Sequence, residues 1–304
     1  MYYYHAYTYR IHSWFELPGF PTCSAPKQTE IPEIYIKQRS LSRDSMDNDH
    51  DAGMSLSGEF KDVFLCRVQN GCEIIVNPYI DSDPDFVRTV ISGELMAALL
   101  RQRGYLVLHG SCVTNGDNTI AFVGYSGWGK STTAAFFLRH GYQLLSEDLL
   151  VVDVNKPHPA VLPGPQALKL KPDAVKMIGD DYKRLPKVYH DTNKVLQAKN
   201  GSNGEKRTPK PLSKIYLLEG CSRRKNEISH IPSNTAMVEL VKHTRTIEWL
   251  TAKAFMKSHF NQCVSLLEKV PVSLLKRKLT LKALPETKQL IEEDLERSSL
   301  MSYP

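Results

Sequence analysis

The sequence predicts an α/β fold in which a mixed sheet is flanked by helices and preceded by a small β-rich region. From residue 81 onward, short apolar runs typical of buried strands alternate with segments whose apolar residues recur at helical spacing. Before residue 80, aromatic residues alternate with small or polar ones, which is the period of a strand. We therefore expect a β-rich region over residues 1–80 and an α/β domain over residues 81–304.

The β-rich region contains two stretches with strand character. Residues 1–15 (MYYYHAYTYRIHSWF) alternate in the way described above, and residues 60–76 (FKDVFLCRVQNGCEIIV) form two short strands joined by a turn at 69–71. The Asp-rich stretch 40–53 lies between them. It lacks the spacing and the closing Glu of a calcium-binding loop, so we expect a solvated loop there.

Residues 81–104 predict a helix. Asp83 and Pro84 suit its first turn, apolar residues follow at helical spacing from Phe86 to Leu100, and Gly104 suits its end. This apolar stripe needs no ligand to explain it, and we interpret the helix as packing on a core.

The remaining elements alternate between strands and helices until the C-terminal third, which is mainly helical. The predicted strands are 105–113, 119–124, 143–154, 213–218 and 272–281. The predicted helices are 130–140, 172–178, 233–242, 246–259, 260–269 and one that begins at Pro285.

One motif stands out between the strand that ends at Val123 and the helix that begins at Lys130. Residues 124–131 read GYSGWGKS, which fits the pattern G-x-x-x-x-G-K-S of a phosphate-binding loop. Its glycines allow backbone N–H groups to point at phosphate oxygens, and the helix N-terminus adds a positive dipole. We expect a nucleoside triphosphate, ATP, to bind here with Mg²⁺. The predicted nucleotide-binding residues are Gly124, Ser126, Gly127, Trp128, Gly129, Lys130, Ser131 and Thr132.

Two adjacent carboxylates, Glu147 and Asp148, follow the loop at the end of an apolar run. Adjacent carboxylates can divide two tasks, one holding a magnesium ion and one taking a proton from an acceptor hydroxyl. An exposed acidic turn is the alternative. The pair lies close after Lys130, whereas motor ATPases usually carry their magnesium-binding Asp much further along, so the spacing argues against a motor ATPase.

His109 and Gly110 end the strand that precedes Ile120. If the two strands are neighbours, His109 lies near the phosphate loop. The competing interpretation is a core histidine whose hydrogen bonds are satisfied within the protein. The residue pattern leaves both interpretations open.

Taken together, these motifs resemble the catalytic domain of bacterial HPr kinase/phosphorylase in order and spacing. Three further stretches are similar to HPr-kinase-like proteins found beside peptide-modification genes, and so are residues 1–100. The resemblance is greatest to the kinases of lasso-peptide clusters, which phosphorylate a serine of the precursor peptide. The three stretches are 162–174 (LPGPQALKLKPDA), 211–219 (PLSKIYLLE) and 285–295 (PETKQLIEEDL).

The resemblance implies a P-loop kinase core of the HPr-kinase type and an ATP-dependent transfer of phosphate to a peptide serine. By position, Lys130 holds the triphosphate, and Ser131 and Asp148 lie at the magnesium ion. Glu147 stands where the family has its catalytic Asp, and His109 matches an active-site histidine. Because Glu replaces Asp at 147, Asp148 stays open as the base. The family's assembly into hexamers makes a homo-oligomer an open expectation.

The chain departs from the family downstream of the acidic pair. The glycine-rich signature loop that true HPr kinases carry there is absent, and residues 186–210 are basic and polar instead. We therefore do not expect HPr as the substrate, nor the reverse phosphorylase reaction. The basic side chains either close over the phosphates, grip an acidic peptide or are merely solvated. They are Lys194, Lys199, Lys206, Arg207 and Lys210.

Two other functions remain open: a kinase of a small hydroxylated molecule, and an ATP-binding regulator without catalysis. The net charge of +6 is mild and spread along the chain, and no nucleic-acid-binding module is present, so we expect no nucleic-acid partner. No apolar run is long enough for a membrane helix, and residues 1–15 lack a signal-peptide pattern. With six scattered cysteines and no CxxC pair, we expect a cytoplasmic protein with reduced thiols.

Overall fold

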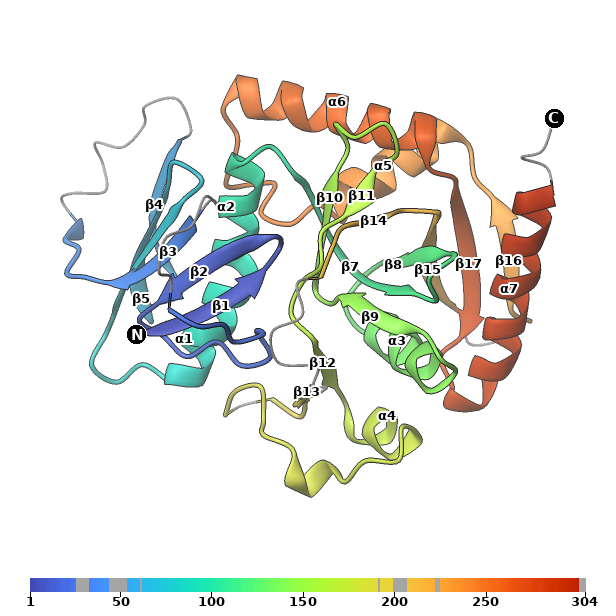
Figure 1. The fold of residues 1–304 in the computed structure, drawn as a ribbon, viewed down its shortest axis with the longest axis horizontal. Coiled ribbons are helices and arrows are strands. Elements are labelled where there is room, and N and C mark those ends of the chain that lie inside the picture. The colour runs from blue at the N-terminus through green and yellow to red at the C-terminus, as the bar shows by residue number, and fades with distance from the viewer. Residues whose placement is uncertain are drawn as a thin grey trace.

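Two large β-sheets, a two-stranded ribbon and the helices that pack on them make up the described part of the chain (Figure 1). The computed structural model describes residues 1–25, 33–43, 54–60, 62–190, 192–198, 207–221 and 225–300. The predicted α/β class, with mixed sheets flanked by helices and a β-rich N-terminus, is confirmed.

The N-terminal sheet has six strands in the order β1-β2-β3-β6-β5-β4, with parallel pairing of β3 to both of its neighbours and antiparallel pairing elsewhere. The turn expected at 69–71 joins β5 to β6, and Asn70 and Gly71 both take positive φ there. The strands are β1 (Tyr2–Ala6), β2 (Tyr9–Ser13), β3 (Glu33–Gln38), β4 (Ser55–Phe60), β5 (Phe64–Gln69) and β6 (Glu73–Pro78).

A nearly continuous helical segment follows and covers the inner face of this sheet. It consists of α1 (Pro84–Val90), a π-helical turn (Ile91–Leu95) and α2 (Met96–Gln102). The side chain of Asp83 accepts a hydrogen bond from the N–H of Asp85 and caps α1. Apolar side chains of this segment share one core with strands of the N-terminal sheet. The helix that we placed at the start of the second region therefore packs against the first.

The second sheet has nine strands, mainly in the order β14-β11-β10-β7-β8-β15-β17-β16. Strands β8, β15 and β17 are parallel, while β7, β10 and β16 run antiparallel to their neighbours. The strands are β7 (Leu106–Thr114), β8 (Thr119–Val123), β9 (Gln143–Ser146), β10 (Leu149–Asp153), β11 (Ala160–Val161), β14 (Lys210–Pro211), β15 (Lys214–Cys221), β16 (Glu227–His230) and β17 (Val272–Lys278).

Helices cover both faces of this sheet. One face packs against α3 (Lys130–Arg139), α4 (Pro172–Met177) and α7 (Leu284–Leu300), and the other packs against α5 (Ser233–Lys242) and α6 (Lys253–Lys269). A separate two-stranded ribbon, β12 (Ala167–Leu170) with β13 (Val195–Ala198), lies beside α4 (Figure 1). The sheet is thus the middle of three layers.

The predicted elements are found with two differences. The strand expected over 143–154 is interrupted at Glu147 and Asp148. The two helices expected over 246–259 and 260–269 are replaced by turns up to Ala252 and by the single helix α6, because no glycine or proline separates His259 from Phe260. Most of the Asp-rich stretch (44–53), and Lys199 and Lys206, lie outside the described residues.

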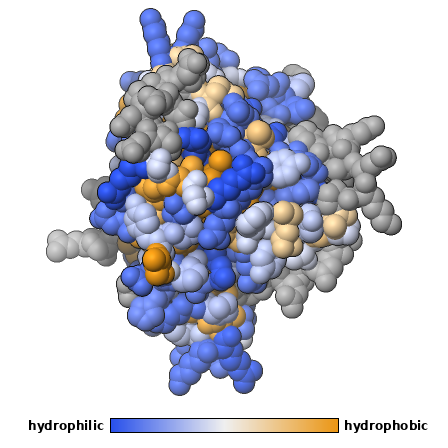
Figure 2. Space-filling model, turned by 90° about the vertical axis from the view of Figure 1, so that its left-hand side faces the viewer, coloured by the Kyte–Doolittle hydropathy of each residue, from blue (hydrophilic) through white to orange (hydrophobic). Residues whose placement is uncertain are grey.

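Seen from the side of the N-terminal sheet, the described surface is mostly hydrophilic, with apolar residues in small areas (Figure 2). Among the described helices, none is both long enough and apolar enough to cross a membrane.

Candidate active site

The glycine-rich segment 124–129 connects the end of β8 to the start of α3, the setting that we predicted for it. Gly124, Gly127 and Gly129 have φ values of +156°, +88° and +86°, a region that residues with a Cβ rarely adopt. The glycines are therefore required by the path of the loop.

Lys130 is almost completely buried at the start of α3 and bends back over the loop. Its Nζ donates hydrogen bonds to the carbonyl oxygens of Gly124 (2.7 Å) and Tyr125 (3.0 Å). Burial lowers the pKa of Lys130 to about 8, although the negative charge of Asp148 opposes this change. The ammonium group thus lies within the loop and keeps its charge at neutral pH.

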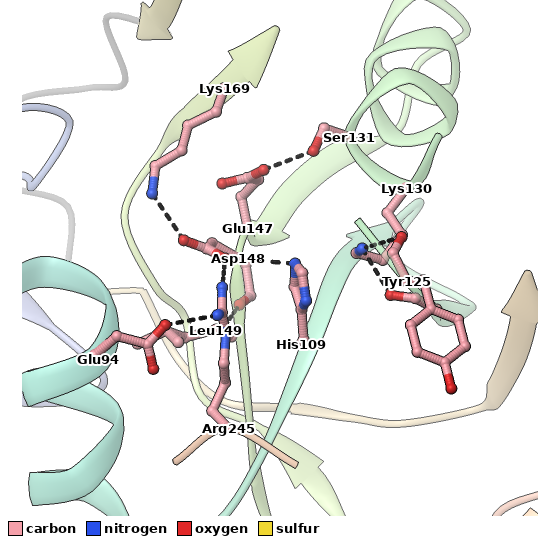
Figure 3. Close-up of polar contacts among 12 residues, drawn as sticks. Glu94, His109, Tyr125, Lys130, Ser131, Glu147, Asp148, Leu149, Lys169 and Arg245 are labelled. Carbon is pink, nitrogen blue, oxygen red and sulfur yellow. Dashed lines mark hydrogen bonds and ion pairs between the residues drawn. The ribbon is translucent and has the colours of Figure 1, made fainter. Parts of the chain in front are cut away.

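Glu147 and Asp148 occupy the break between β9 and β10, both of which pair with β7. Asp148 has a φ of +66°, and the N–H of Leu149 donates to the carbonyl of Glu147. This local reversal turns the two carboxylates in different directions (Figure 3).

Glu147 points toward the phosphate loop. Its Oε1 accepts a hydrogen bond of 2.7 Å from the Ser131 hydroxyl. Burial, together with the charge of Asp148, raises the pKa of Glu147 to about 7. A carboxylate with such a pKa can take up and release a proton near neutrality.

Asp148 lies among cationic side chains. Its carboxylate forms ion pairs with Lys169 (2.7 Å) and with Arg245, and the His109 Nε2 lies 3.6 Å away. Burial alone would raise the pKa of Asp148, but Lys169 and Arg245 hold it well below its usual range. Asp148 is therefore ionised at neutral pH.

Arg245 is placed by a short segment that follows α5. The N–H of Arg245 donates to the carbonyl of Val107 in β7, and its guanidinium reaches both Asp148 and Glu94 (2.8 Å). Glu94 belongs to the π-helical turn, an irregularity often found at functional sites. The guanidinium thus links the helical segment over the N-terminal sheet to the acidic pair.

His109 lies in β7 directly opposite Leu149. Burial and the nearby charge of Arg245 lower the pKa of His109 to about 3, so the imidazole is neutral at physiological pH. Next to it, a Cβ on Gly110 would lie 2.9 Å from the Phe122 carbonyl oxygen, so the close packing of β7 requires glycine here.

These groups line one partly open pocket of about 550 Å³. The pocket brings together the four predicted catalytic residues His109, Lys130, Glu147 and Asp148. Of the predicted loop residues, it is also lined by Ser126, Gly127, Gly129, Ser131 and Thr132. Gly124 and Trp128 are not among its lining residues, and Trp128 instead packs against the core that contains α3.

Other lining residues were not predicted for the site. Lys169 lies in a stretch that carried the family resemblance, whereas nothing in the sequence pointed to Arg245. Lys194, for which contact with the phosphates, contact with an acidic peptide and mere solvation were all left open, lines the pocket. The Arg207 guanidinium bonds to main-chain carbonyls of Leu144 and Gly164. The remaining lining residues are Thr89, Lys171, Val188, Tyr189 and Thr192.

The oxygen atoms of the site suit a magnesium ion that arrives with a triphosphate. Mg²⁺ is usually held by one or two protein oxygens together with phosphate oxygens and water. The Ser131 hydroxyl donates a hydrogen bond to Glu147, and Asp148, the other predicted magnesium ligand, lines the same pocket. The described residues contain no cluster of three or more His, Cys, Asp or Glu side chains suited to a metal, and a magnesium site of this kind does not need one.

Comparison of the sequence with known families and with curated proteins finds neither a matching family model nor a matching curated protein. The function is therefore argued from the geometry of the pocket.

Proposed function

We propose that this chain is an α/β P-loop kinase, with a core of the HPr-kinase type, that transfers the γ-phosphoryl group of MgATP to a serine hydroxyl of a peptide. One observation carries the proposal: a glycine-rich loop with a buried lysine and a carboxylate whose pKa lies near 7 meet in a single pocket. The resemblance to lasso-peptide precursor kinases suggests the acceptor. We further propose that the protein acts in the cytoplasm.

Binding would rest on the loop and the first turn of α3. The loop amides and the N-terminus of α3 supply partial positive charge to the phosphates, and Lys130 supplies a full one. Ser131 offers its hydroxyl to the magnesium ion, which neutralises charge on the phosphates when bound. The hydroxyl oxygen can ligate the ion through a lone pair while its proton still donates to Glu147, so the two contacts are compatible.

Transfer needs a group that accepts the hydroxyl proton. In the proposed step, the serine oxygen attacks the γ-phosphorus as the bond to the bridging oxygen breaks, ADP leaves, and the proton passes to Glu147. The raised pKa of Glu147 suits it to this task better than Asp148, whose charge is held by two cations. Asp148 would keep Lys169 and Arg245 oriented toward the reacting groups.

The pocket is lined by more positive than negative side chains. Lys169, Lys171 and Lys194 lie on the ribbon of β12 and β13 or beside it, and all three line the pocket. A pocket of this charge favours an acceptor with acidic groups near the serine.

The direct test is the transfer of labelled γ-phosphate from MgATP to a panel of acceptors. The panel holds unstructured peptides with internal and C-terminal serines, HPr and small polyols. We expect label on a peptide, and no label with Lys130→Ala. The matched control is Lys253→Ala, an exposed lysine at the start of α6, which should transfer label like the unaltered protein.

The other outcomes separate the competing functions. Label on a polyol but on no peptide would indicate a small-molecule kinase. Binding of MgATP without transfer to any acceptor would favour a non-catalytic ATP-binding regulator and contradict the proposal.

A further inference from the structure

A second arginine lies against the phosphate loop from the side opposite the acidic pair. Arg277 is close to the C-terminal end of β17, and its side chain is 3% exposed. A Cβ built on Gly129 would lie 2.5 Å from its Nη2. The guanidinium therefore packs directly on the loop residue that precedes Lys130.

The register of the sheet explains this position. Val123 at the end of β8 is level with Leu217 of β15, which is level with Leu274 of β17. Arg277 is three residues further along, level with Gly220 of β15 and beyond the level at which β8 ends and the loop begins. Leu275 packs into the core on the α3 side, and alternation along the strand directs Arg277 to that same side.

Within the described part of the chain, Arg277 has no counter-charge. Its Nε and Nη1 are buried and have no hydrogen-bond partner, and no carboxylate there forms an ion pair with it. Burial lowers its pKa to about 10, and no neighbouring charge adds to or offsets this effect. The group is therefore still charged at neutral pH.

A buried charge without a partner destabilises a folded protein, and such groups are normally paired. The neighbour of Arg277 on the same face of β17, Leu275, packs into an apolar core, so an apolar residue would suit this position. An arginine at this position therefore lowers the stability of the ligand-free protein. We expect a compensating stabilisation when a ligand is bound.

We infer that Arg277 is a buried positioning residue for the phosphate chain of the nucleotide, and that a bound phosphate group supplies the counter-charge that the ligand-free protein lacks. The inference rests on the proposed function only in taking the loop as a phosphate site. It concerns binding rather than transfer. Because Gly129 has no side chain, the Arg277 guanidinium lies directly against the loop backbone. A phosphate group bound by the loop would therefore lie close to this charge.

This role and a purely structural one predict opposite changes in stability. Arg277→Met keeps the length of the side chain and removes the charge. If the charge serves a ligand, the ligand-free variant should melt at the same temperature as the unaltered protein or higher. Its dissociation constants for MgATP and for inorganic triphosphate should rise about tenfold or more. Arg277→Lys, which keeps a charge, should retain part of the affinity.

The experiment combines thermal unfolding without ligand with calorimetric titration of MgATP and of inorganic triphosphate. Lys278→Met removes the neighbouring, exposed charge of the same strand and should change neither quantity. A lower melting temperature for Arg277→Met with unchanged dissociation constants would overturn the inference and make Arg277 a structural residue.

The remaining outcomes keep the two proposals apart. Normal binding by the unaltered protein without phosphoryl transfer would refute the kinase and leave the role of Arg277 supported by the binding data. No binding of either phosphate compound by the unaltered protein would refute both.

Discussion

The Ser131 hydroxyl donates a 2.7 Å hydrogen bond to the Glu147 carboxylate, and this contact joins the first turn of α3 to the break between β9 and β10. The segment that follows the glycine-rich loop and the acidic pair are therefore already in contact without a ligand. Because the same carboxylate has a pKa of about 7, the contact is sensitive to pH in the neutral range.

The first prediction concerns the pH dependence of kcat/KM, which reports groups of the free enzyme. Glu147 must be deprotonated to accept a proton, so kcat/KM should rise through about pH 7. Lys130 must be protonated to hold phosphate, so kcat/KM should fall again through about pH 8. Glu147→Gln should lower kcat by about 10²–10⁴-fold and remove the rising limb. A rising limb that persists in this variant would assign the proton to another group.

A second prediction is that His109 stays neutral. Its pKa of about 3 implies that the imidazole resonances do not change between about pH 5 and 8, the range in which a free histidine titrates. Two-dimensional NMR of nitrogen-labelled protein can measure this, with His109→Asn to identify the signal. A titration within that range would show that His109 carries a charge beside Asp148 and would contradict the prediction.

The third prediction concerns the coupling between Arg245 and Glu94. Arg245→Gln leaves Asp148 and Glu94 without their shared guanidinium, and should lower the free energy of unfolding by about 2–3 kcal/mol in urea denaturation. The double variant Arg245→Gln/Glu94→Gln should lose less free energy of unfolding than the two single variants lose together, because the two side chains interact directly.

Arg184→Gln is the control for Arg245. Arg184 also pairs with an aspartate, but its side chain is 86% exposed, and such pairs contribute little to stability. Additive effects of Arg245→Gln and Glu94→Gln would contradict the link between the helical segment and the acidic pair.

A fourth prediction tests why glycine follows His109. Gly110→Ala places a Cβ 2.9 Å from the Phe122 carbonyl oxygen and 3.3 Å from the Leu150 Cβ. Because these two residues belong to the strands on opposite sides of β7, a shift of β7 cannot relieve both contacts. We expect a loss of about 1–3 kcal/mol in the free energy of unfolding. Gly58→Ala, in strand β4, has open space around its Cβ and should change stability by less than about 0.5 kcal/mol. Equal thermal stability of the two variants would refute the argument.

The sequence predicted the part of the site that depends on local order. The loop, Lys130 and the acidic pair follow one another closely along the chain, and the buried strand and the helix on either side of the loop were visible as apolar patterns. His109 lines the same pocket as the loop because β7 and β8 are hairpin partners, whereas the residue pattern had left this position and that of a core histidine both open.

The rest of the site depends on contacts between distant segments. Arg245 reaches Asp148 only because residues 243–245 run along β7, and the apolar spacing after Thr246 looked helical although Thr246 takes a φ of +51°. The π-helical turn that presents Glu94 cannot be distinguished from α-helix by apolar spacing. The break between β9 and β10 at Glu147 and Asp148 could not be predicted from the apolar pattern, because both flanking strands are apolar.

The order of the parallel strands also bears on how the chain folds as it is synthesised. The phosphate loop is complete once residue 132 has been made, yet the next strand beside β8, β15, begins only at Lys214, and β17 begins at Val272. Until those strands emerge from the ribosome, one edge of β8 has no partner, and the core on the α3 side lacks the apolar side chains of β15 and β17. Such non-local pairing slows folding and leaves apolar surface open to aggregation. We therefore expect shortened chains that end before β17 to be recovered mainly as insoluble protein.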